Sequence, residues 1–259
     1  MIDRKYYWLL STFIIREIRN RYISSMGGLL WAFLNPIMHL LIYAFVFTYI
    51  FKVRLPGMES TYFLGFVAIA LWPWLAFQEA VQLGTVAIKG NSDLIKKAAL
   101  PYDILIYSRV VAIFFVHTIG YALVLIIINL FVVPLHLWLF PVLFLWLVLQ
   151  LLLTAGLVLL LSPLHVLFPD IEHVLPPVLM ALFYATPVLY SAEMVPAKFG
   201  VMLSINPLAL YFETIRGVML SGIPGIKGAT LIMAACFVAI FVIGRWFFSR
   251  LSPYFEDFL

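Results

Sequence analysis

Charged side chains are scarce in this sequence, making up 11% of 259 residues against 65% hydrophobic residues. A soluble domain has about 25% charged residues, so the composition excludes an ordinary soluble globular protein and predicts an integral membrane protein. Cysteine is nearly absent, since Cys236 is the only one. A single cysteine excludes both a disulfide framework within the chain and a metal site built from several cysteines.

Catalytic and nucleotide-binding motifs are also absent. The sequence contains no H-E-x-x-H pair, no Walker loop with its lysine and no G-x-G-x-x-G turn. His165, Asp170 and His173 are spaced unlike a standard ligand set, so we expect no metal. We predict a protein that is not an enzyme and binds no cofactor, driven by an ion gradient or by a partner. No cleavable signal peptide is expected, because polar and aromatic residues precede the first apolar run.

Long apolar runs dominate the rest of the chain. A helix needs about 20 apolar residues to cross the hydrocarbon core of a bilayer, and six runs meet that length. The sequence therefore predicts an all-α integral membrane fold. Its six transmembrane helices are expected at about residues 29–51, 61–83, 104–133, 138–161, 172–190 and 228–249.

The distribution of Lys and Arg predicts the topology. If the N-terminus is inside, ten of the 16 basic residues lie in inner segments, five lie outside, and Arg109 lies within a span. Cytoplasmic loops carry the excess of Lys and Arg, so we expect both termini in the cytoplasm. Because the basic residues follow the ends of the apolar runs, they indicate membrane topology, and we expect no nucleic acid partner.

Residues 1–28 are expected to form an amphipathic helix on the cytoplasmic membrane surface. Leu10, Ile14 and Ile18 recur every four residues on one stripe, while Arg16 and Arg19 lie roughly opposite. A basic, aromatic-rich helix of this kind lies along the headgroup region. Its role is either a topology anchor or a functional surface.

A second polar segment, residues 91–100, separates two predicted spans. Asn91 or Ser92 can cap a short helix, and Pro101 ends it. The segment combines charged and apolar side chains, and is either a positive topology signal or a docking helix for a soluble cytoplasmic subunit. The side chains involved are Asp93, Leu94, Ile95, Lys96 and Lys97.

Residues 199–222 are apolar but interrupted. Asn206-Pro207 breaks the run near its centre, because proline lacks the amide hydrogen that a helix needs. Glu213 and Arg216 add charges that lipid disfavours. We predict two half-helices that enter the outer leaflet and return, which is a candidate gate.

Polar and aromatic side chains within the spans are further candidates. Glu79 and His39 lie in predicted spans, where an ionisable group is either functional or the partner of a neighbouring polar group. The aromatic candidates either line a channel on which sugar rings stack or pack against lipid and other helices. These aromatic residues are Tyr43, Phe47, Phe183 and Tyr184.

Four stretches together resemble a known family. They are "RYISSMGGLLWAFLNPIMHLLIYAFVF", "LWPWLAFQEAV", "NSDLIKKAALPYDIL" and "NPLALYFETIRGVMLSG". In order and spacing they are similar to the membrane subunit of export-type ABC transporters for cell-surface polysaccharides such as O-antigen, capsule or teichoic acid. One departure is Pro169-Asp170, where the family pattern has Arg-Asp, so the contact there is expected to be altered.

The resemblance implies a homodimer in the bacterial inner membrane that binds two cytoplasmic ATPase subunits, which hold ATP and Mg. Its substrate would be a lipid-linked polysaccharide. The resemblance places Asn206, Pro207, Glu213 and Arg216 in an outer gate. It places Asn91, Leu94, Ile95, Lys96, Lys97 and Pro101 in the cytoplasmic loop that meets the ATPase. We expect Asp93, Arg16 and Arg19 to belong to the same docking surface.

Other functions remain open at this point. A permease of the same architecture could move a small hydrophobic molecule or drug. An ion-coupled lipid-glycan flippase could use Glu79 as its ion site. An intramembrane transferase lacks the residues that its chemistry needs.

Overall fold

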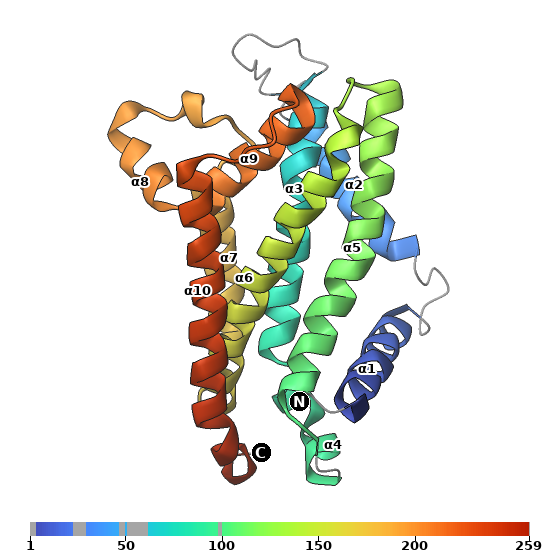
Figure 1. The fold of residues 1–259 in the computed structure, drawn as a ribbon, viewed down its shortest axis with the longest axis vertical. Helices are drawn as coiled ribbons and strands as arrows, with labels where there is room; N and C mark the ends of the chain where they lie inside the picture. Colours follow the sequence, from blue (N-terminus) through green and yellow to red (C-terminus); the bar gives the residue numbers. More distant parts are fainter. Residues whose placement is uncertain (1–3, 23–29, 47–49, 51–61, 98–99, 259) are drawn as a thin grey trace.

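The structure, a computed structural model, describes residues 4–22, 30–46, 50, 62–97 and 100–258. This part of the chain is a helical bundle with no strand, shown in Figure 1. Both termini and the short helix α4 (Ser92–Lys97) lie at one end of the bundle in Figure 1. The broken helix pair α8 (Gly200–Ile205) and α9 (Pro207–Ser221) lies toward the opposite end. Below, the first end is called inner and the second outer, following the predicted topology.

Four described helices are long and apolar enough to cross a membrane. This finding confirms the prediction of an all-α membrane protein. α6 is preceded by the 3-10 turn η3 (Leu137–Leu139). The four helices are α3 (Tyr62–Thr85), α5 (Asp103–Phe131), α6 (Phe140–Leu167) and α10 (Gly228–Leu251).

Two shorter apolar helices occupy the remaining predicted spans. α2 (Leu30–Phe45) has 16 residues and α7 (Ile171–Ala185) has 15, both below the length of about 20 that a straight span needs. The count of six spans therefore stays a prediction. The expectation that 172–190 is one continuous helix is wrong, because the helix ends at Ala185. Thr186 is extended at that point, as is usual for a residue that precedes a proline.

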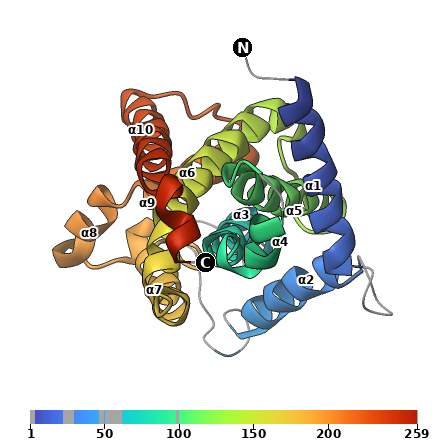
Figure 2. The same ribbon diagram turned by 90° about the horizontal axis from the view of Figure 1, so that it is seen from below.

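The remaining helix, α1 (Arg4–Tyr22), lies obliquely across α5 at the inner end of the bundle (Figures 1 and 2). The helix expected within residues 1–28 is present, while its position on the membrane surface stays a prediction. Conversely, α6 extends past the predicted boundary at 161 as far as Leu167, although Pro163 lies inside it.

α3 is the central helix of the bundle. It packs against α2, α5, α6, α7 and α9, and most of its residues are buried, whereas α10 is largely exposed. Its backbone also carries an irregularity. Pro73 lies inside α3, and a proline at that position cannot donate to the carbonyl four residues earlier, which is Ile69.

Neighbouring helices hydrogen-bond the carbonyls of α3. The Tyr121 hydroxyl of α5 donates to the Ile69 carbonyl at 2.7 Å, satisfying the acceptor that Pro73 leaves free. The Gln150 amide of α6 donates to the Pro73 carbonyl at 2.9 Å. In lipid a backbone group without a partner costs several kcal/mol, so these bonds allow a proline-containing helix at the centre of a membrane bundle.

α6 and α10 form the closest helix contact. A Cβ atom placed on Gly156 would lie 2.6 Å from the Cα of Phe241, and one placed on Gly244 would meet the Gly156 carbonyl oxygen. Small residues at such crossings let two backbones approach, which is how helices associate in membranes without a hydrophobic driving force.

We expect Tyr121→Phe to destabilise the bundle by about 1–3 kcal/mol, because it leaves the buried Ile69 carbonyl without a partner. The measurement is thermal or denaturant unfolding of the purified chain in detergent. Tyr184→Phe is the control, since Tyr184 is 56% exposed. Equal stability of the two variants would contradict the role assigned to the Tyr121 hydroxyl.

Candidate functional site

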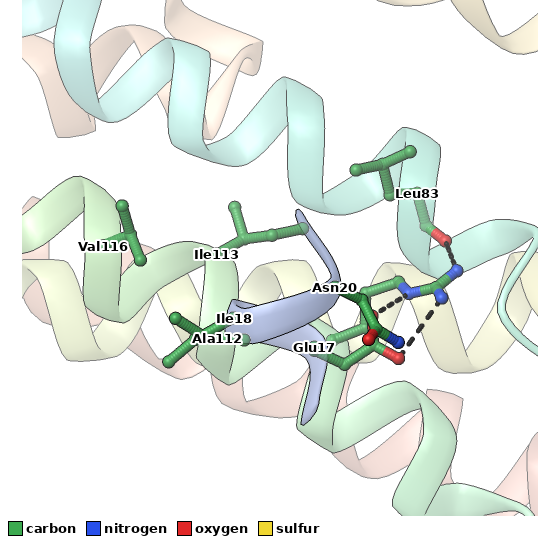
Figure 3. Close-up of a pocket in the computed structure, with 8 residues that line it drawn as sticks. Glu17, Ile18, Asn20, Leu83, Ala112, Ile113 and Val116 are labelled. Atoms are coloured by element: carbon green, nitrogen blue, oxygen red, sulfur yellow. Dashed lines mark hydrogen bonds and ion pairs between the residues drawn. The ribbon is translucent and has the colours of Figure 1, made fainter. Parts of the chain in front are cut away.

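At the inner end, an ion pair ties α1 to the bundle. The Glu17 carboxylate of α1 accepts hydrogen bonds from Arg109 Nε at 3.0 Å and Nη2 at 3.3 Å. Arg109 Nη1 also donates to the Leu83 carbonyl near the end of α3 at 3.2 Å. Figure 3 shows Glu17 and the Leu83 carbonyl on the guanidinium group. The charge of Arg109, which the sequence placed within a span, is therefore neutralised at the inner end of α5.

A second contact joins α1 to the turn before α4. Arg16 Nη2 donates to Asn91 Oδ1 at 3.0 Å, and Asn91 Nδ2 donates to the Ala87 carbonyl at 2.8 Å. The Asn91 side chain thus bridges α1 to the end of α3 and does not cap α4, as its position had suggested. Arg16 also stacks over the Phe13 ring, 4.4 Å from its centroid.

The two sides of α4 have different surroundings, one packed on the bundle and the other exposed. Ile95 is buried and Leu94 is partly buried in the apolar cluster that includes Phe13 of α1. The chain itself therefore covers Ile95 and part of Leu94. The predicted docking residues that remain exposed are Arg19, Asp93, Lys96, Lys97 and Pro101.

Helix α10 is also bonded to α5 at the inner end. Arg245 Nη1 of α10 donates to Asp103 Oδ2, at the start of α5, at a distance of 2.6 Å. Tyr6 of α1 lies beside this pair, where burial and the negative charge of Asp103 raise the pKa of its phenol, so it stays protonated at neutral pH. α1, α3, α5, α10 and the α4 turn are thus connected by polar contacts at one end of the bundle.

At the outer end, Asn206 organises the break between α8 and α9. Its side-chain oxygen accepts from the Leu208 amide at 3.0 Å, which caps α9, with Pro207 as the first helical residue. Its side-chain nitrogen donates to Thr186 Oγ1 at 2.9 Å. The predicted helix break at Asn206-Pro207 is present. Whether this segment re-enters the membrane or acts as a gate stays a prediction.

Arg216 anchors α9 to the bundle. Its guanidinium donates to the Phe66 carbonyl of α3 at 3.1 Å and to the Pro187 and Val188 carbonyls at 2.6 and 2.5 Å. It also lies 3.6 Å from the centroid of the Phe66 ring. Arg216 is buried and Glu213 is exposed, and both line a cavity of about 370 Å³. The partners of the Arg216 guanidinium in this cluster are backbone carbonyls of α3 and of the segment after α7.

The aromatic candidates for the channel also divide into buried and exposed side chains. Tyr43 of α2 and Phe183 of α7 have ring centroids 6.1 Å apart, and Phe183 also packs 5.3 Å from Trp74 of α3. Phe183 is buried, Tyr43 is partly exposed and Tyr184 is 56% exposed. Tyr43 and Tyr184 therefore keep free surface for a ligand; Phe47 lies outside the described residues.

Glu79 and His39 line one pocket of about 240 Å³ between α2, α3 and α5. The Glu79 carboxylate lies 2.7 Å from His117 Nε2 of α5, and His39 Nδ1 bonds the Asn35 carbonyl at 2.8 Å. Gln78 and Gln82 also line this pocket. The sequence reading overlooked His117 and the glutamines, although the four-residue spacing of Gln78 and Gln82 placed them on one helix face.

The arrangement defines the class as a helical membrane protein with a charged short helix at one end and a broken helix pair at the other. The chain belongs to the ABC-2 type transporter family, whose model matches residues 9–220. Members of this family are the membrane permease subunits of ABC exporters and are not themselves catalytic.

Curated relatives cover nearly the whole chain. The O-antigen export system permease protein RfbA of Myxococcus xanthus is 30% identical over 98% of this chain and 96% of its own length. The protein of the same name from Klebsiella pneumoniae is 28% identical over 97% and 95%. The polysialic acid transport protein KpsM of Escherichia coli is 26% identical over 80% of each chain.

We expect Arg216→Met to destabilise the chain by about 3–5 kcal/mol, because three buried carbonyls lose their donor while the apolar volume is kept. Arg216→Lys should restore only part of the lost stability, since an ammonium group lacks the planar fork of donors that reaches three acceptors. Chemical unfolding in detergent measures this. The control Glu213→Gln removes an exposed charge and should leave stability within about 0.5 kcal/mol.

A double-mutant cycle tests the contact between α1 and α5. We expect Glu17→Gln and Arg109→Gln to show a coupling free energy of about 1–2 kcal/mol, because the pair is largely buried and doubly hydrogen-bonded. Each variant should also increase amide hydrogen exchange in α1. Additive effects of the two substitutions would contradict a direct interaction.

Proposed function

We propose that this chain is the channel-forming permease subunit of an ABC exporter that moves a lipid-linked polysaccharide of the O-antigen type. The observation that carries the proposal is its similarity to two O-antigen export permeases over at least 97% of its length. In this proposal it lies in the bacterial inner membrane with both termini in the cytoplasm. The common position of the termini at one end of the bundle supports this topology.

The proposed transporter has two copies of this chain and two cytoplasmic ATPase subunits, which bind ATP and Mg. A match to the ABC-2 family over most of the chain supports an ATPase partner. In this arrangement the exposed side of α4, with Asp93, Lys96 and Lys97, meets the ATPase. The opposite side of α4 packs on the cluster that includes Phe13 of α1.

The contacts at the inner end define how force would enter the membrane domain. Closure of the ATPase pair on ATP would push α4 and α1. Arg16 bonds the α4 turn through Asn91, and Glu17 bonds Arg109, which in turn bonds α3. A displacement of α1 or α4 is therefore transmitted to α3 and α5. The spans at the dimer interface would then separate and the glycan would advance past Tyr43 and Tyr184.

One alternative has a structural observation in its favour. The Glu79–His117 pair, at 2.7 Å, could serve as an ion or proton site in a gradient-driven flippase. That alternative requires transport that stops when the gradient collapses and continues when ATP is depleted. The ATP-driven exporter requires the reverse.

We expect the double substitution Lys96→Glu and Lys97→Glu to reduce the recovery of a copurifying ATPase at least about tenfold, because reversed charges oppose a complementary surface. Mass spectrometry after gentle-detergent purification from the native host measures recovery. Staining of surface polysaccharide in a deletion strain carrying each variant measures export. The double variant should remain folded, since both lysines are exposed.

Lys198→Glu is the matched control, because Lys198 is exposed on the opposite side of the predicted membrane. It should retain both the ATPase and export. If the wild-type chain copurifies with no ATPase, or if deletion leaves surface polysaccharide unchanged, the proposed function is wrong. If the wild-type chain recovers an ATPase and the double variant recovers as much of it, the assignment of Lys96 and Lys97 to the docking surface is wrong. The proposed exporter function is not affected by that result.

A further inference from the structure

The pocket between α2, α3 and α5 is unusually polar for its depth in the bundle. Glu79 lies six residues before the end of α3, which is about 9 Å along the helix from its inner end. The pocket also receives Asn35 from α2, Gln78 and Gln82 from α3, and His117 from α5. Polar side chains within membrane helices are costly, and a cluster of them is a functional site by default.

The hydrogen-bonding capacity of this pocket is mixed. Each amide of Asn35, Gln78 and Gln82 has both donor and acceptor atoms. Gln78 already makes one hydrogen bond within the protein, since its side-chain oxygen accepts from Trp74 Nε1 at 2.9 Å. Among the described residues, the side chains of Gln82 and Asn35 make no hydrogen bond to protein. A ligand with several adjacent hydroxyl groups matches this combination of donors and acceptors.

The charges in the pocket argue against other ligands. None of the described residues that line it is Lys or Arg, the side chains that bind phosphate through charge-assisted hydrogen bonds. Its only carboxylate, Glu79, lies 2.7 Å from His117 Nε2, whereas Mg²⁺ and Ca²⁺ require about six oxygen ligands. The carboxylate also disfavours acidic ligands. An uncharged polyol remains as the best match.

The size of the pocket and its aromatic lining limit the range of ligands further. The volume of about 240 Å³ is below the roughly 300–1,000 Å³ of pockets for drug-sized molecules, which indicates one ring and not an oligomer. Trp31 lines the pocket and is 52% exposed. Its indole can therefore lie against the apolar face of a ring while the amides reach the hydroxyl groups.

The pocket residue His39 lies next to the aromatic contact between α2 and α7. Asn35, His39 and Tyr43 are spaced by four residues and share one face of α2. The His39 and Tyr43 rings are 6.4 Å apart, and Tyr43 is followed by Phe183 at 6.1 Å. One stripe of α2 therefore leads from the polar pocket to the aromatic side chains farther toward the outer end.

We propose that this pocket binds one uncharged sugar unit of the exported glycan through its hydroxyl groups, on the inner side of Tyr43. This proposal rests on the proposed function and adds a specific binding site to it. Asn35 and Gln82 supply the hydrogen bonds, Trp31 supplies the stacking surface, and the Glu79–His117 pair forms the polar floor.

Equilibrium dialysis tests the proposal. The full-length chain is placed in nanodiscs without the ATPase, and the probe is a set of labelled oligosaccharide fragments released by mild acid from the host's own surface polysaccharide. We expect Gln82→Met and Asn35→Leu each to raise the Kd about five- to tenfold, because each removes hydrogen bonds while nearly preserving volume. Trp31→Leu should weaken binding similarly.

Asn20→Leu is the matched control, because Asn20 is an exposed asparagine of α1 outside this pocket, and it should leave the Kd unchanged. Competition by inorganic pyrophosphate would assign the site to a phosphate group and overturn the proposal. Absence of binding to the wild type, or equal Kd values for all variants, would also overturn it. These results differ from failure of the proposed function, which is measured separately as unchanged surface polysaccharide in the deletion strain.

Discussion

Hydrogen bonding to the backbone of α3 is the interaction on which the rest of the bundle depends. Pro73 leaves the Ile69 carbonyl without a helical partner, and the Tyr121 hydroxyl of α5 donates a hydrogen bond to that carbonyl. Side chains of α6, α9 and α5 bind further α3 carbonyls at Pro73, Phe66 and Leu83. In a low-dielectric surrounding without water these bonds are strongly favoured, so α3 is held by its neighbours at several heights.

This arrangement places α3 in contact with both candidate functional ends. Arg109 binds the Leu83 carbonyl at the inner end, and Arg216 binds the Phe66 carbonyl at the outer end. One helix, α3, is thus in contact with both Arg109 near the α1–α4 region and Arg216 of α9. In the proposed exporter, a force applied by the ATPase has a continuous packed path to the outer segment, and that path passes the polar pocket between α2, α3 and α5.

Much of the fold could be predicted from the sequence, because apolar run length sets where helices form in a membrane protein. A described helix overlaps each of the six predicted spans, four of these helices are long enough to cross a membrane, and the break at Asn206-Pro207 lies where the sequence indicated. Boundaries were less predictable. α7 stops at Ala185, before Thr186-Pro187, whereas α6 continues past Pro163 to Leu167. A proline is tolerated or not according to whether neighbouring helices satisfy the freed carbonyl, which local sequence does not reveal.

Composition, apolar run length and helical period were enough to predict the class of protein, most of the helices and the candidate polar side chains. The partners of those side chains became evident only from the packed helices. Arg216 binds three backbone carbonyls, Glu79 lies beside His117, and Ile95 packs in the cluster that includes Phe13. The reason is that hydropathy and helical period depend on neighbours along the chain. The contacts of Arg216 and Glu79 join residues 28 to 150 positions apart, which come together only when the helices pack.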